Sequence, residues 1–346
     1  MHSHRYAAYV VVAVLLIATF VLTACAAPAP ARPAVTQAPA AQPTPAAEAP
    51  KAPEGKKKIG FSVYDMQYGF FQDMEKGTRE AAQAAGYDYV LVDEKSSEST
   101  MVSATQDLIN QGISALIISP FRPDALGPIV DAAKAKGIPV VINDIGGGGT
   151  NYDVIVISDN EKGGVIAADQ MDTLIKGKAG AAKKVASITC EPSAVYAARR
   201  NVGFEKEIKQ LGYEVVATLS GNSKQEEGYK VMKDILSAHP DVAGVFSCND
   251  PMAVGAAQAI ADSGKSGSKD VFVIGFNADE IALKAIKAGQ MAATVQQVPY
   301  DMGKMTVGLA TQLLAGEKLQ FGNDKDREIY VPVNLITAEN VDTLLK

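Results

Sequence analysis

The stretch Ala115-Leu116-Ile117-Ile118, inside the segment 114–119, decides the fold class of this sequence. Four apolar residues in a row, without the alternation of a half-exposed strand, are typical of a parallel strand that helices cover on both faces. Stretches with the period of an amphipathic helix flank this run at 100–111 and 123–136. The stretch therefore predicts an α/β architecture in which buried parallel strands alternate with helices.

Outward from this stretch, the same alternation fills the chain twice. The first set of strands is expected at 58–64, 87–92, 114–119, 138–143 and 154–157, and its helices at 70–85, 100–111, 123–136 and 161–176. The second set of strands is expected at 184–190, 213–219, 242–248, 271–276 and 292–296, and its helices at 195–211, 224–238, 251–262, 279–288 and 300–315. A weak internal repeat relates the halves, because Gly77 to Gly86 followed by Tyr87 matches Gly203 to Gly212 followed by Tyr213. The pattern predicts two doubly wound parallel-sheet lobes.

The N-terminus carries an uncharged apolar run from Ala7 to Leu22. As a helix this run would span ~24 Å, short of the ~30 Å hydrocarbon core of a bilayer, so residues 1–24 are predicted to be an export signal. The run ends in Leu22-Thr23-Ala24-Cys25, which resembles the lipobox of bacterial lipoproteins. This resemblance implies a lipidated Cys25 as the mature first residue. An ordinary secretory signal with an incidental cysteine is the alternative.

Residues 26–55 have the composition of a tether. They contain 12 Ala and 8 Pro in 30 residues and show no apolar periodicity. Such a segment cannot bury enough surface to offset its chain entropy, so we expect a partly extended linker. Residues 25–55 would then hold the folded body outside the cytoplasm, anchored to the membrane through Cys25, in the periplasm or at the outer face of the cell membrane.

Charge and composition exclude several classes of function. The formal net charge is −6, and it becomes −7 when Arg5 in the predicted signal is left out. An acidic body without a basic stripe lacks what nucleic-acid binding requires. Histidine occurs only at His2, His4 and His239, and no metal-type cluster is evident, so we expect neither a metal site nor a cofactor. We expect no enzyme, although paired carboxylates at strand ends leave a glycosidase as an alternative.

The ends of the predicted strands carry a particular set of side chains. In open parallel sheets, ligands bind beyond the carboxyl ends of the strands. Aromatic rings and planar polar groups gather there: Tyr64, Asp65, Gln67, Tyr68, Phe70, Phe71, Asn143, Asp144, Glu191, Tyr196, Arg200, Asn222, Asn249, Asp250, Asn277, Gln296 and Gln297. The hydroxyls of a sugar need paired hydrogen bonds once they are dry, and its C–H faces pack on aromatic rings. These positions therefore predict a site for a sugar or polyol.

At these positions the sequence resembles the periplasmic sugar-binding proteins of ABC transporters, in particular the ribose-binding-like group. The similarity covers residues 57 to about 320. Its carriers, in chain order, are Tyr68-Gly69-Phe70-Phe71, Ile138-Pro139-Val140-Val141, Ser158-Asp159-Asn160, Arg200-Asn201-Val202-Gly203-Phe204, Asn249-Asp250-Pro251-Met252-Ala253, Val273-Ile274-Gly275-Phe276-Asn277 and Ala293-Thr294-Val295-Gln296-Gln297. The resemblance implies the periplasmic binding protein-like I fold, in which three chain crossings form a hinge between two lobes.

The resemblance also implies where the lobes divide. We expect the crossings near Ser158, near Val298 and within 323–330. The N-terminal lobe would then hold 56–158 and 298–325, and the C-terminal lobe 159–297 and 326–346. Ligand would bind between the lobes and close them by a hinge motion.

The ligand contacts implied by the resemblance are Tyr68, Phe70, Phe71, Asp144, Arg200, Asn249, Asn277 and Gln297. The two phenylalanines would wall the sugar ring, Asp144 would accept hydrogen bonds from hydroxyls, and Arg200 would donate in a planar fork. Asn249 would both donate and accept, and Gln297 would complete the set at a hinge crossing.

The chain departs from the family pattern at three places. Ile145 stands where arginine is common, Asn277 where aspartate is common, and an aromatic residue is missing near Ser223. These departures weigh against ribose itself and leave a pocket for a neutral monosaccharide or polyol.

The function implied is that of an extracytoplasmic solute-binding protein, a monomer that delivers its sugar to an ABC permease and its ATPase. A sugar-sensing subunit for a chemoreceptor or kinase is the alternative, because it would use the same closure. Repressors of the lactose-repressor type share the lobes, but they carry a DNA-binding helix-turn-helix where this chain has a signal and tether.

Two cysteines end neighbouring strands of the second predicted lobe. With strand order 2-1-3, the strands 184–190 and 242–248 lie side by side and bring Cys190 near Cys248. Parallel side-chain directions often spoil the torsion of a disulfide, so we expect a close pair of thiols, although an oxidising compartment favours the bond.

Overall fold

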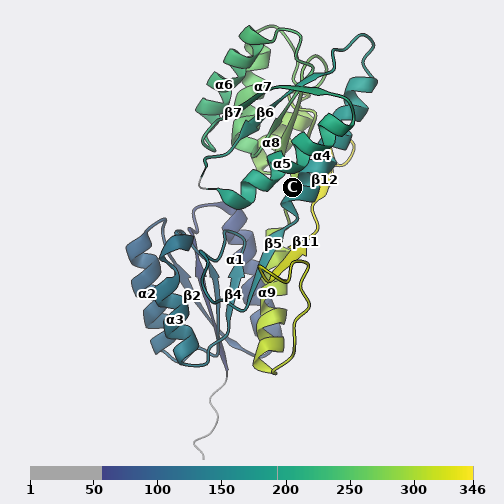
Figure 1. Ribbon diagram of the computed structural model, residues 1–346. Helices are drawn as coiled ribbons and strands as arrows, with labels where there is room; N and C mark the ends of the chain where they lie inside the picture. Colours follow the sequence, from purple (N-terminus) through teal and green to yellow (C-terminus); the bar gives the residue numbers. More distant parts are fainter. Residues whose placement is uncertain (1–56, 193, 346) are drawn as a thin grey trace, which may run out of the picture. The chain divides into compact units, whose positions relative to one another are not determined.

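The computed structural model describes residues 57–192 and 194–345, in two α/β lobes that each contain a six-stranded sheet (Figure 1). The predicted signal peptide, Cys25 and tether lie outside the described residues. The predicted fold class is confirmed. Every strand pair is parallel except that of β10 and β12, the edge pair of the second sheet.

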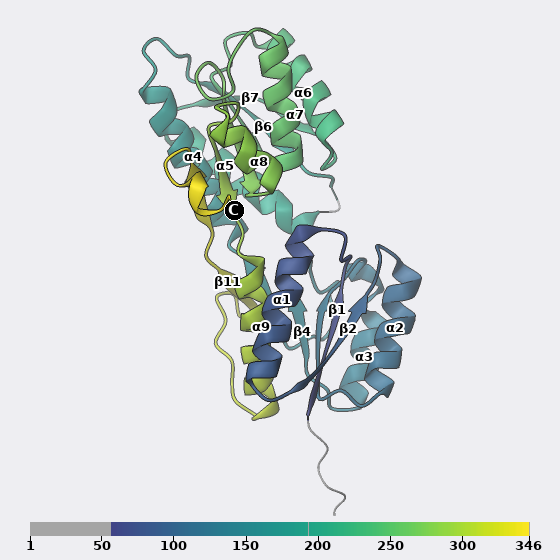
Figure 2. The same ribbon diagram turned by 180° about the vertical axis from the view of Figure 1, so that it is seen from behind.

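The first lobe has strand order β11-β5-β4-β3-β1-β2. Its strands are β1 (Lys58–Val63), β2 (Asp88–Asp93), β3 (Ala115–Ser119), β4 (Val140–Asn143), β5 (Val154–Ser158) and β11 (Glu328–Val331). Its helices are α1 (Gly69–Ala84), α2 (Glu98–Asn110), the short 3-10 helix η1 (Pro123–Ala125), α3 (Gly127–Ala135) and α9 (Pro299–Leu314). Helices α1 and α9 cover one face of the sheet, and α2 and α3 cover the other (Figure 2).

The second lobe repeats this plan with strand order β12-β10-β9-β8-β6-β7. Its strands are β6 (Lys184–Thr189), β7 (Glu214–Ser220), β8 (Gly244–Ser247), β9 (Phe272–Asn277), β10 (Ala293–Gln296) and β12 (Asn334–Thr337). Its helices are α4 (Asn160–Lys176), α5 (Val195–Gln210), α6 (Gln225–Ala238), α7 (Asp250–Asp262), α8 (Glu280–Lys287) and the 3-10 helix η2 (Val341–Thr343). The predicted 2-1-3 order is confirmed, because β6 lies between β7 and β8.

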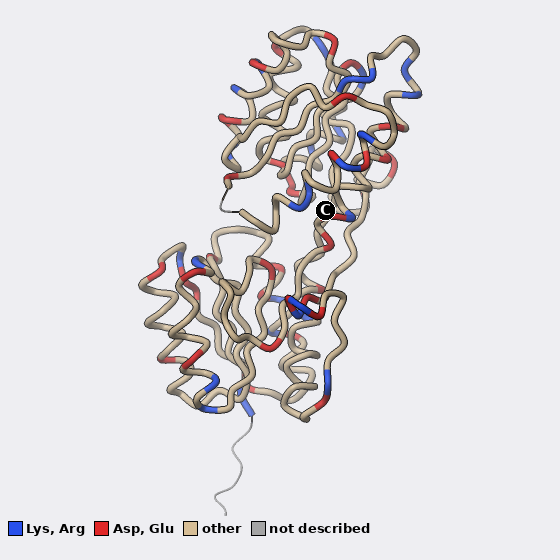
Figure 3. The backbone as a smooth tube through the Cα atoms, in the orientation of Figure 1, with Lys and Arg blue, Asp and Glu red and all other residues tan. Residues whose placement is uncertain are grey.

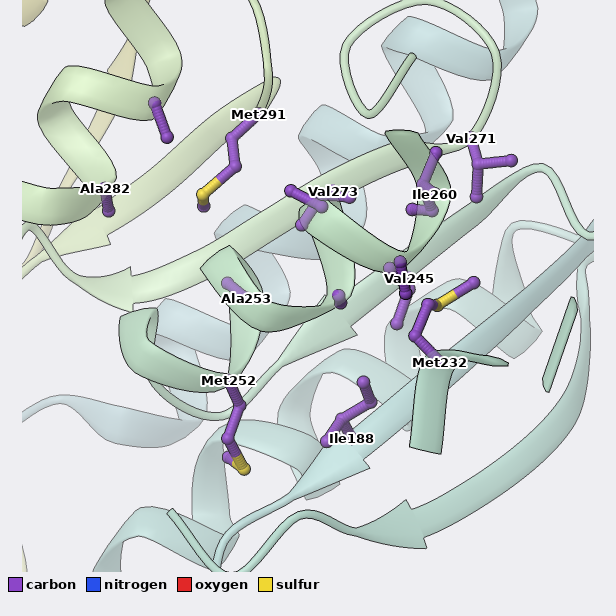
Figure 4. Close-up of a cluster of buried hydrophobic side chains, with 14 of the residues drawn as sticks. Ile188, Met232, Val245, Met252, Ala253, Ile260, Val271, Val273, Ala282 and Met291 are labelled. Carbon is purple, nitrogen blue, oxygen red and sulfur yellow. The ribbon is translucent and has the colours of Figure 1, made fainter. Parts of the chain in front are cut away.

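The apolar strands divide their side chains between the two faces of each sheet. In β3, Leu116 and Ile118 pack with α2 and α3, whereas Ala115 and Ile117 pack on the side of α1 and α9. In the second lobe, Met232, Met252 and Ile260 of α6 and α7 fill one face, as Figure 4 shows. Because both faces are buried, the sequence of each strand reads as a continuous apolar run instead of an alternating one.

The third chain crossing lies later than expected. Segment 328–331, which the sequence placed in the C-terminal lobe, forms β11 and pairs in parallel with β5 of the first sheet. Strand β12, from Asn334 to Thr337, pairs with β10 of the second sheet. The crossing therefore falls at 332–333, and the expectation of 323–330 is wrong. Two four-residue strands on either side of Pro332 are too short to show a period in the sequence.

Charged residues of both signs are interspersed over the two lobes (Figure 3). In the described part of the chain, Figure 3 shows no stripe of basic residues of the kind that tracks a nucleic-acid backbone. No helix within residues 57–192 and 194–345 is both long enough and apolar enough to cross a bilayer.

Candidate functional site

A cavity of about 980 Å³ lies at the carboxyl ends of the strands and is lined by residues of both lobes. Its lining combines aromatic rings, carboxylates, guanidinium groups and a glycine-rich loop. The lining residues are Tyr64, Phe121, Arg122, Pro123, Asp124, Asp144, Ile145, Gly146, Gly148, Gly149, Asn160, Glu191, Ala194, Val195, Tyr196, Ala197 and Arg200. Two of the eight predicted ligand contacts, Asp144 and Arg200, are therefore brought to one cavity.

Asp144 is one of the carboxylates that the first lobe contributes to the cavity. It follows β4 directly and has a φ of 71°, in the left-handed region that costs free energy for a residue with a Cβ. Among the described residues, its carboxylate accepts no hydrogen bond. Burial raises its pKa to about 6, although the charge of Arg200 opposes the shift. Asp144 is thus an acceptor held ready for a donor that the described residues do not supply.

Arg200 is held much more firmly. It is 7% exposed, and its Nε donates to Asn160 Oδ1 over 2.7 Å. Its Nη1 donates to the carbonyl oxygen of Cys248 at 2.9 Å and to Asn277 Oδ1 at 3.3 Å. The guanidinium also lies 4.0 Å from the centre of the Phe276 ring. Among the described residues its Nη2 group has no acceptor, so two N–H donors remain for a ligand.

Burial also changes the acidity of Arg200. It lowers the pKa of the guanidinium to about 10, while the nearby carboxylates of Asp144, Asp250 and Asp279 oppose this effect. The group stays protonated at neutral pH and remains a donor.

Helix packing sets the position of Arg200. Its helix, α5, crosses α4 at Gly164, where a Cβ would collide with the Arg200 carbonyl oxygen and the backbone nitrogen of Phe204. Only glycine allows the two backbones to approach so closely. The glycine at position 164 thus brings α5 close enough for Arg200 to reach Asn160 on α4.

Asn277 and Gln297 lie beside Arg200 and outside the cavity lining. Gln297 Nε2 donates to Asn277 Oδ1 at 2.8 Å, and Ser158 Oγ donates to Gln297 Oε1 at 2.8 Å. Asn277 Nδ2 donates in turn to Asp279 Oδ2 at 3.2 Å. Ser158 and Gln297 stand at two of the chain crossings, so this chain of hydrogen bonds connects the hinge to Arg200.

Asn249 serves as the N-cap of α7. Its Oδ1 accepts a hydrogen bond from the backbone N–H of Met252 at 3.1 Å, and its Nδ2 donates to the Ser223 carbonyl at 3.3 Å. In the structure described here, both ends of this side chain are already engaged.

The three predicted aromatic residues form the support of the cavity wall. The ring of Phe71 stacks on Tyr64 with a centroid distance of 5.1 Å, and Phe70 meets Phe71 edge-on at 5.1 Å. Tyr68 is 48% exposed and contacts both Tyr64 and Phe71 edge-on. Tyr64 itself lines the cavity and meets Phe121, 5.2 Å away. The cluster presents Tyr64 and Phe121 to the cavity, with Tyr68, Phe70 and Phe71 around them.

Phe121 and Asn160 line the cavity but were not predicted as site residues. Phe121 follows β3, and its backbone N–H donates to Glu94 Oε2 over 2.6 Å. Burial raises the pKa of Glu94 to about 7, against the hydrogen bonds from Ser62 and Phe121. The only signal for Phe121 in the sequence is its place just after a strand end. Asn160 lies in the quoted Ser158-Asp159-Asn160 motif.

Two buried polar residues at the same edge of the first sheet lack partners. Ser119 ends β3 and Asn143 ends β4, and both are fully buried. Neither the hydroxyl of Ser119 nor the amide atoms of Asn143 have a hydrogen-bond partner among the described residues. Buried polar groups are nearly always paired, so these two residues are exceptions at the carboxyl edge of the first sheet.

Cys190 and Cys248 form a disulfide, with their Cα atoms 5.8 Å apart. The expectation of a close pair is confirmed, and the preference for free thiols is wrong. The reason is local geometry: Cys248 lies one residue beyond β8, where its backbone still donates to Ile188 of β6, and the two Cα atoms fall within the range that disulfides use.

In the described part of the chain, no group of three or more His, Cys, Asp and Glu side chains is placed to hold a metal ion. The chemistry that the lining offers is hydrogen bonding and aromatic packing. Those are the interactions by which a polyhydroxylated ring is bound.

Comparison with known proteins defines the class. Residues 59–318 match the family model described as a periplasmic binding protein domain. The chain therefore belongs to that family. It is 35% identical over 329 residues to the ribose import binding protein RbsB of Bacillus subtilis (strain 168), with 94% of this chain and 98% of that protein covered.

Solved structures agree with this assignment. A periplasmic ribose ABC transporter from Conexibacter woesei DSM 14684 matches with a TM-score of 0.76 and 25% identity, covering 84% of this chain and 95% of that chain. A carbohydrate transporter solute binding protein from Agrobacterium radiobacter, solved with D-arabinose, matches with a TM-score of 0.70 and 30% identity, covering 85% of this chain and 100% of that chain.

Proposed function

We propose that this protein captures a neutral monosaccharide or polyol between its two lobes and delivers it to an ABC permease and its ATPase. The family and the names of its relatives support a sugar-binding role in import. The sugar is bound and released unchanged, and the binding protein acts as a monomer.

The observation that carries the proposal is the complementary pair Asp144 and Arg200. Asp144, on the first lobe, offers an acceptor without a donor, and Arg200, on the second lobe, offers two N–H groups without an acceptor. A hydroxylated ring supplies both partners at once, because each hydroxyl donates and accepts. The rings of Tyr64 and Phe121 provide apolar faces in the same cavity.

The charges of the lining favour an uncharged ligand. Three carboxylates, from Asp124, Asp144 and Glu191, stand against two guanidinium groups, from Arg122 and Arg200. The Arg122 guanidinium is already paired with Asp124 through two hydrogen bonds. A sugar phosphate or sugar acid would therefore bring its charge into a lining that holds no surplus of positive charge.

The cellular setting is also part of the proposal. Proteins of this family work outside the cytoplasm, and we infer that Cys25 anchors this one to a membrane through attached acyl chains. A Cys25→Ala variant expressed from the full sequence should lose palmitate labelling and leave the membrane fraction. Continued labelling of that variant would exclude lipidation at Cys25.

Isothermal titration calorimetry with D-ribose, D-arabinose, xylitol and myo-inositol tests the binding function, with ribose 5-phosphate as the charged control. We expect one of the neutral compounds to bind and the phosphate to fail. Chromatography of the compound released from the complex should return it unaltered. Tight binding of the phosphate, or a chemically changed product, would contradict the proposal.

A further inference from the structure

The disulfide lies at the carboxyl edge of the second sheet, where the ligand cavity is. Cys190 follows the last residue of β6, and Cys248 follows the last residue of β8. Both residues are buried, with exposures of 7% and 0%. The crosslink therefore joins two strand ends beside Glu191, which lines the cavity.

Hydrogen bonds tie the surroundings of the disulfide to the cavity. The Cys190 carbonyl accepts from Ser220 Oγ at 3.0 Å, which joins the end of β7 to the end of β6. Glu191, the residue after Cys190, lines the cavity and accepts a hydrogen bond from Ser223 Oγ. The ends of β6, β7 and β8 are thus held together around the crosslink.

The second connection leads directly to Arg200. The carbonyl oxygen of Cys248 accepts the 2.9 Å hydrogen bond from Arg200 Nη1, which is the shorter of the two bonds that this nitrogen makes. Ala194 and Ala197, at the start of α5, pack on the hydrophobic cluster that contains both cysteines. The crosslinked strand end is therefore one of the groups that hold the guanidinium, together with Asn160 on α4.

We propose that the Cys190–Cys248 disulfide positions the ligand site, so that loss of the crosslink weakens sugar binding as well as stability. This inference rests on the proposed binding function. The cysteines are positioning residues, since they act on the ligand through Arg200 and through the strand ends. Without the crosslink, the Cys248 carbonyl gains freedom, and ligand binding has to restrict it again.

The test compares the double variant Cys190→Ala/Cys248→Ala with a matched control, Val271→Ala. Val271 belongs to the same hydrophobic cluster and is 1% exposed, but it precedes β9 at the opposite end of the strands. Both variants should be less stable than the wild type. Titration calorimetry, at a temperature where all three proteins are folded, uses the neutral compound that the wild type binds.

We expect the double variant to bind about three- to tenfold more weakly, because Arg200 keeps its charge and its bond to Asn160, and only the strand end that accepts from Nη1 becomes less rigid. The Val271→Ala variant should bind as the wild type does. Wild-type affinity in the double variant, or an equal loss in the control, would overturn the proposal.

Amide hydrogen exchange provides a readout that needs no ligand. Removal of the crosslink should speed amide exchange in the first turns of α5 and at residues 248–250 and 252, whereas Val271→Ala should leave these amides unchanged. If no sugar binds to the wild type, the proposed function fails, and the exchange rates alone then decide the role of the disulfide. If the double variant does not fold, dithiol reduction of the folded wild type replaces it, with mass spectrometry confirming that two protons and two electrons were added per disulfide.

Discussion

The two lobes differ in how firmly the carboxyl ends of their strands are held at the cavity. In the second lobe, the strand ends after β6 and β8 are crosslinked, and Arg200 already makes three hydrogen bonds. In the first lobe, Tyr64 and Pro120 occupy the places equivalent to the two cysteines, and Asp144 accepts no hydrogen bond among the described residues. One lobe thus holds a preorganised donor, and the other holds an acceptor that is still unpaired.

This difference suggests that the two lobes, which share one topology, contribute to ligand binding in different ways. A preorganised donor loses little entropy when it binds, so the second lobe is suited to select the ligand. An unpaired, half-buried carboxylate gains most free energy when a hydrogen-bond donor reaches it. The first lobe is therefore suited to stabilise the closed state of the two lobes. Substitutions in each lobe test this difference.

Removal of the disulfide between Cys190 and Cys248 should lower the free energy of unfolding of the second lobe. The disulfide closes a loop with a sequence separation of 58 residues. In the chain-entropy account, a loop of this length corresponds to ~4 kcal/mol of stabilisation. Urea unfolding of Cys190→Ala/Cys248→Ala should show a loss of this order relative to the wild type. A loss below ~1 kcal/mol would mean that the strand pairing alone holds this edge.

The ion pair between Arg199 and Glu328 joins the two lobes directly. The guanidinium donates to both oxygens of Glu328 at 2.9 and 3.0 Å, and Glu328 is fully buried in β11. Arg199→Met leaves that carboxylate in place with donors only from Asn323 and Tyr330, so we expect unfolding to become easier by ~3 kcal/mol. The double variant Arg199→Met/Glu328→Gln should recover much of the loss, and no recovery would contradict this explanation.

The same pair predicts a pH dependence. Burial alone would raise the pKa of Glu328, but hydrogen bonds from Arg199 and Tyr330 outweigh it and hold the pKa below its ordinary value. The stabilisation is therefore present above the unfolded pKa of ~4.3 and is lost as the pH falls through the lower folded value. Stability measured from pH 7 to pH 3 should fall less in Arg199→Met than in the wild type.

Replacement of Arg200 tests the preorganised donor. Arg200→Met removes the two free N–H groups and their charge, and hydrogen bonds to a charged group contribute ~1.5 to 3 kcal/mol each. Affinity for the neutral ligand should fall by about a hundredfold. Arg200→Lys keeps the charge without the planar fork and should resemble Arg200→Met more than the wild type. Calorimetry showing wild-type affinity for either variant would rule out this role.

The unpaired acceptor can be tested through pH. Burial raises the pKa of Asp144 to about 6, so the free protein increasingly binds a proton there as the pH falls below that value. If the ionised form binds the sugar, affinity at pH 5 should be about tenfold lower than at pH 7.5. Asp144→Asn should bind weakly at both pH values and show no such slope. A slope that persists in the variant would assign the dependence to another group.

A pair of buried serines gives the smallest contrast. Ser119 in the first lobe has no partner among the described residues, whereas Ser187 in the second lobe accepts from Asn201 Nδ2 at 2.8 Å. Ser187→Ala should destabilise by ~1 to 2 kcal/mol, because it removes an acceptor from a buried amide. Ser119→Ala should be neutral or slightly stabilising without ligand. Equal losses in thermal unfolding would show that Ser119 is paired after all.

Much of the architecture follows from local patterns. The run Ala115-Leu116-Ile117-Ile118 is buried on both faces of a parallel sheet, as its composition predicts, and the strand order around β6 follows from doubly wound topology. The exceptions are β11 and β12, whose four residues each are too few to carry a period. Their place in the sheets is decided by pairing partners far away in the chain.

The sequence predicted where in the fold the candidate site lies, but it predicted only some of the residues that line the cavity. Strand-end position and family resemblance identified Asp144 and Arg200, which do line the cavity. The same reasoning selected Asn249 and Gln297, whose side chains are engaged in a helix cap and in a hinge network. A planar polar residue at a strand end can serve either purpose, and its sequence context does not distinguish them.

Periodicity, composition and the order of strands were therefore enough to predict the two lobes and the edge of the sheets at which the cavity lies. Which polar groups are still free to bind follows from the folded chain and not from local sequence patterns. Whether a side chain has a partner depends on atoms brought together from distant segments, as when Cys248 and Asn160 both receive hydrogen bonds from Arg200. The disulfide also depends on the tertiary structure, because a difference of a few ångströms in the distance between the two Cα atoms decides whether the cysteines are bonded or remain thiols.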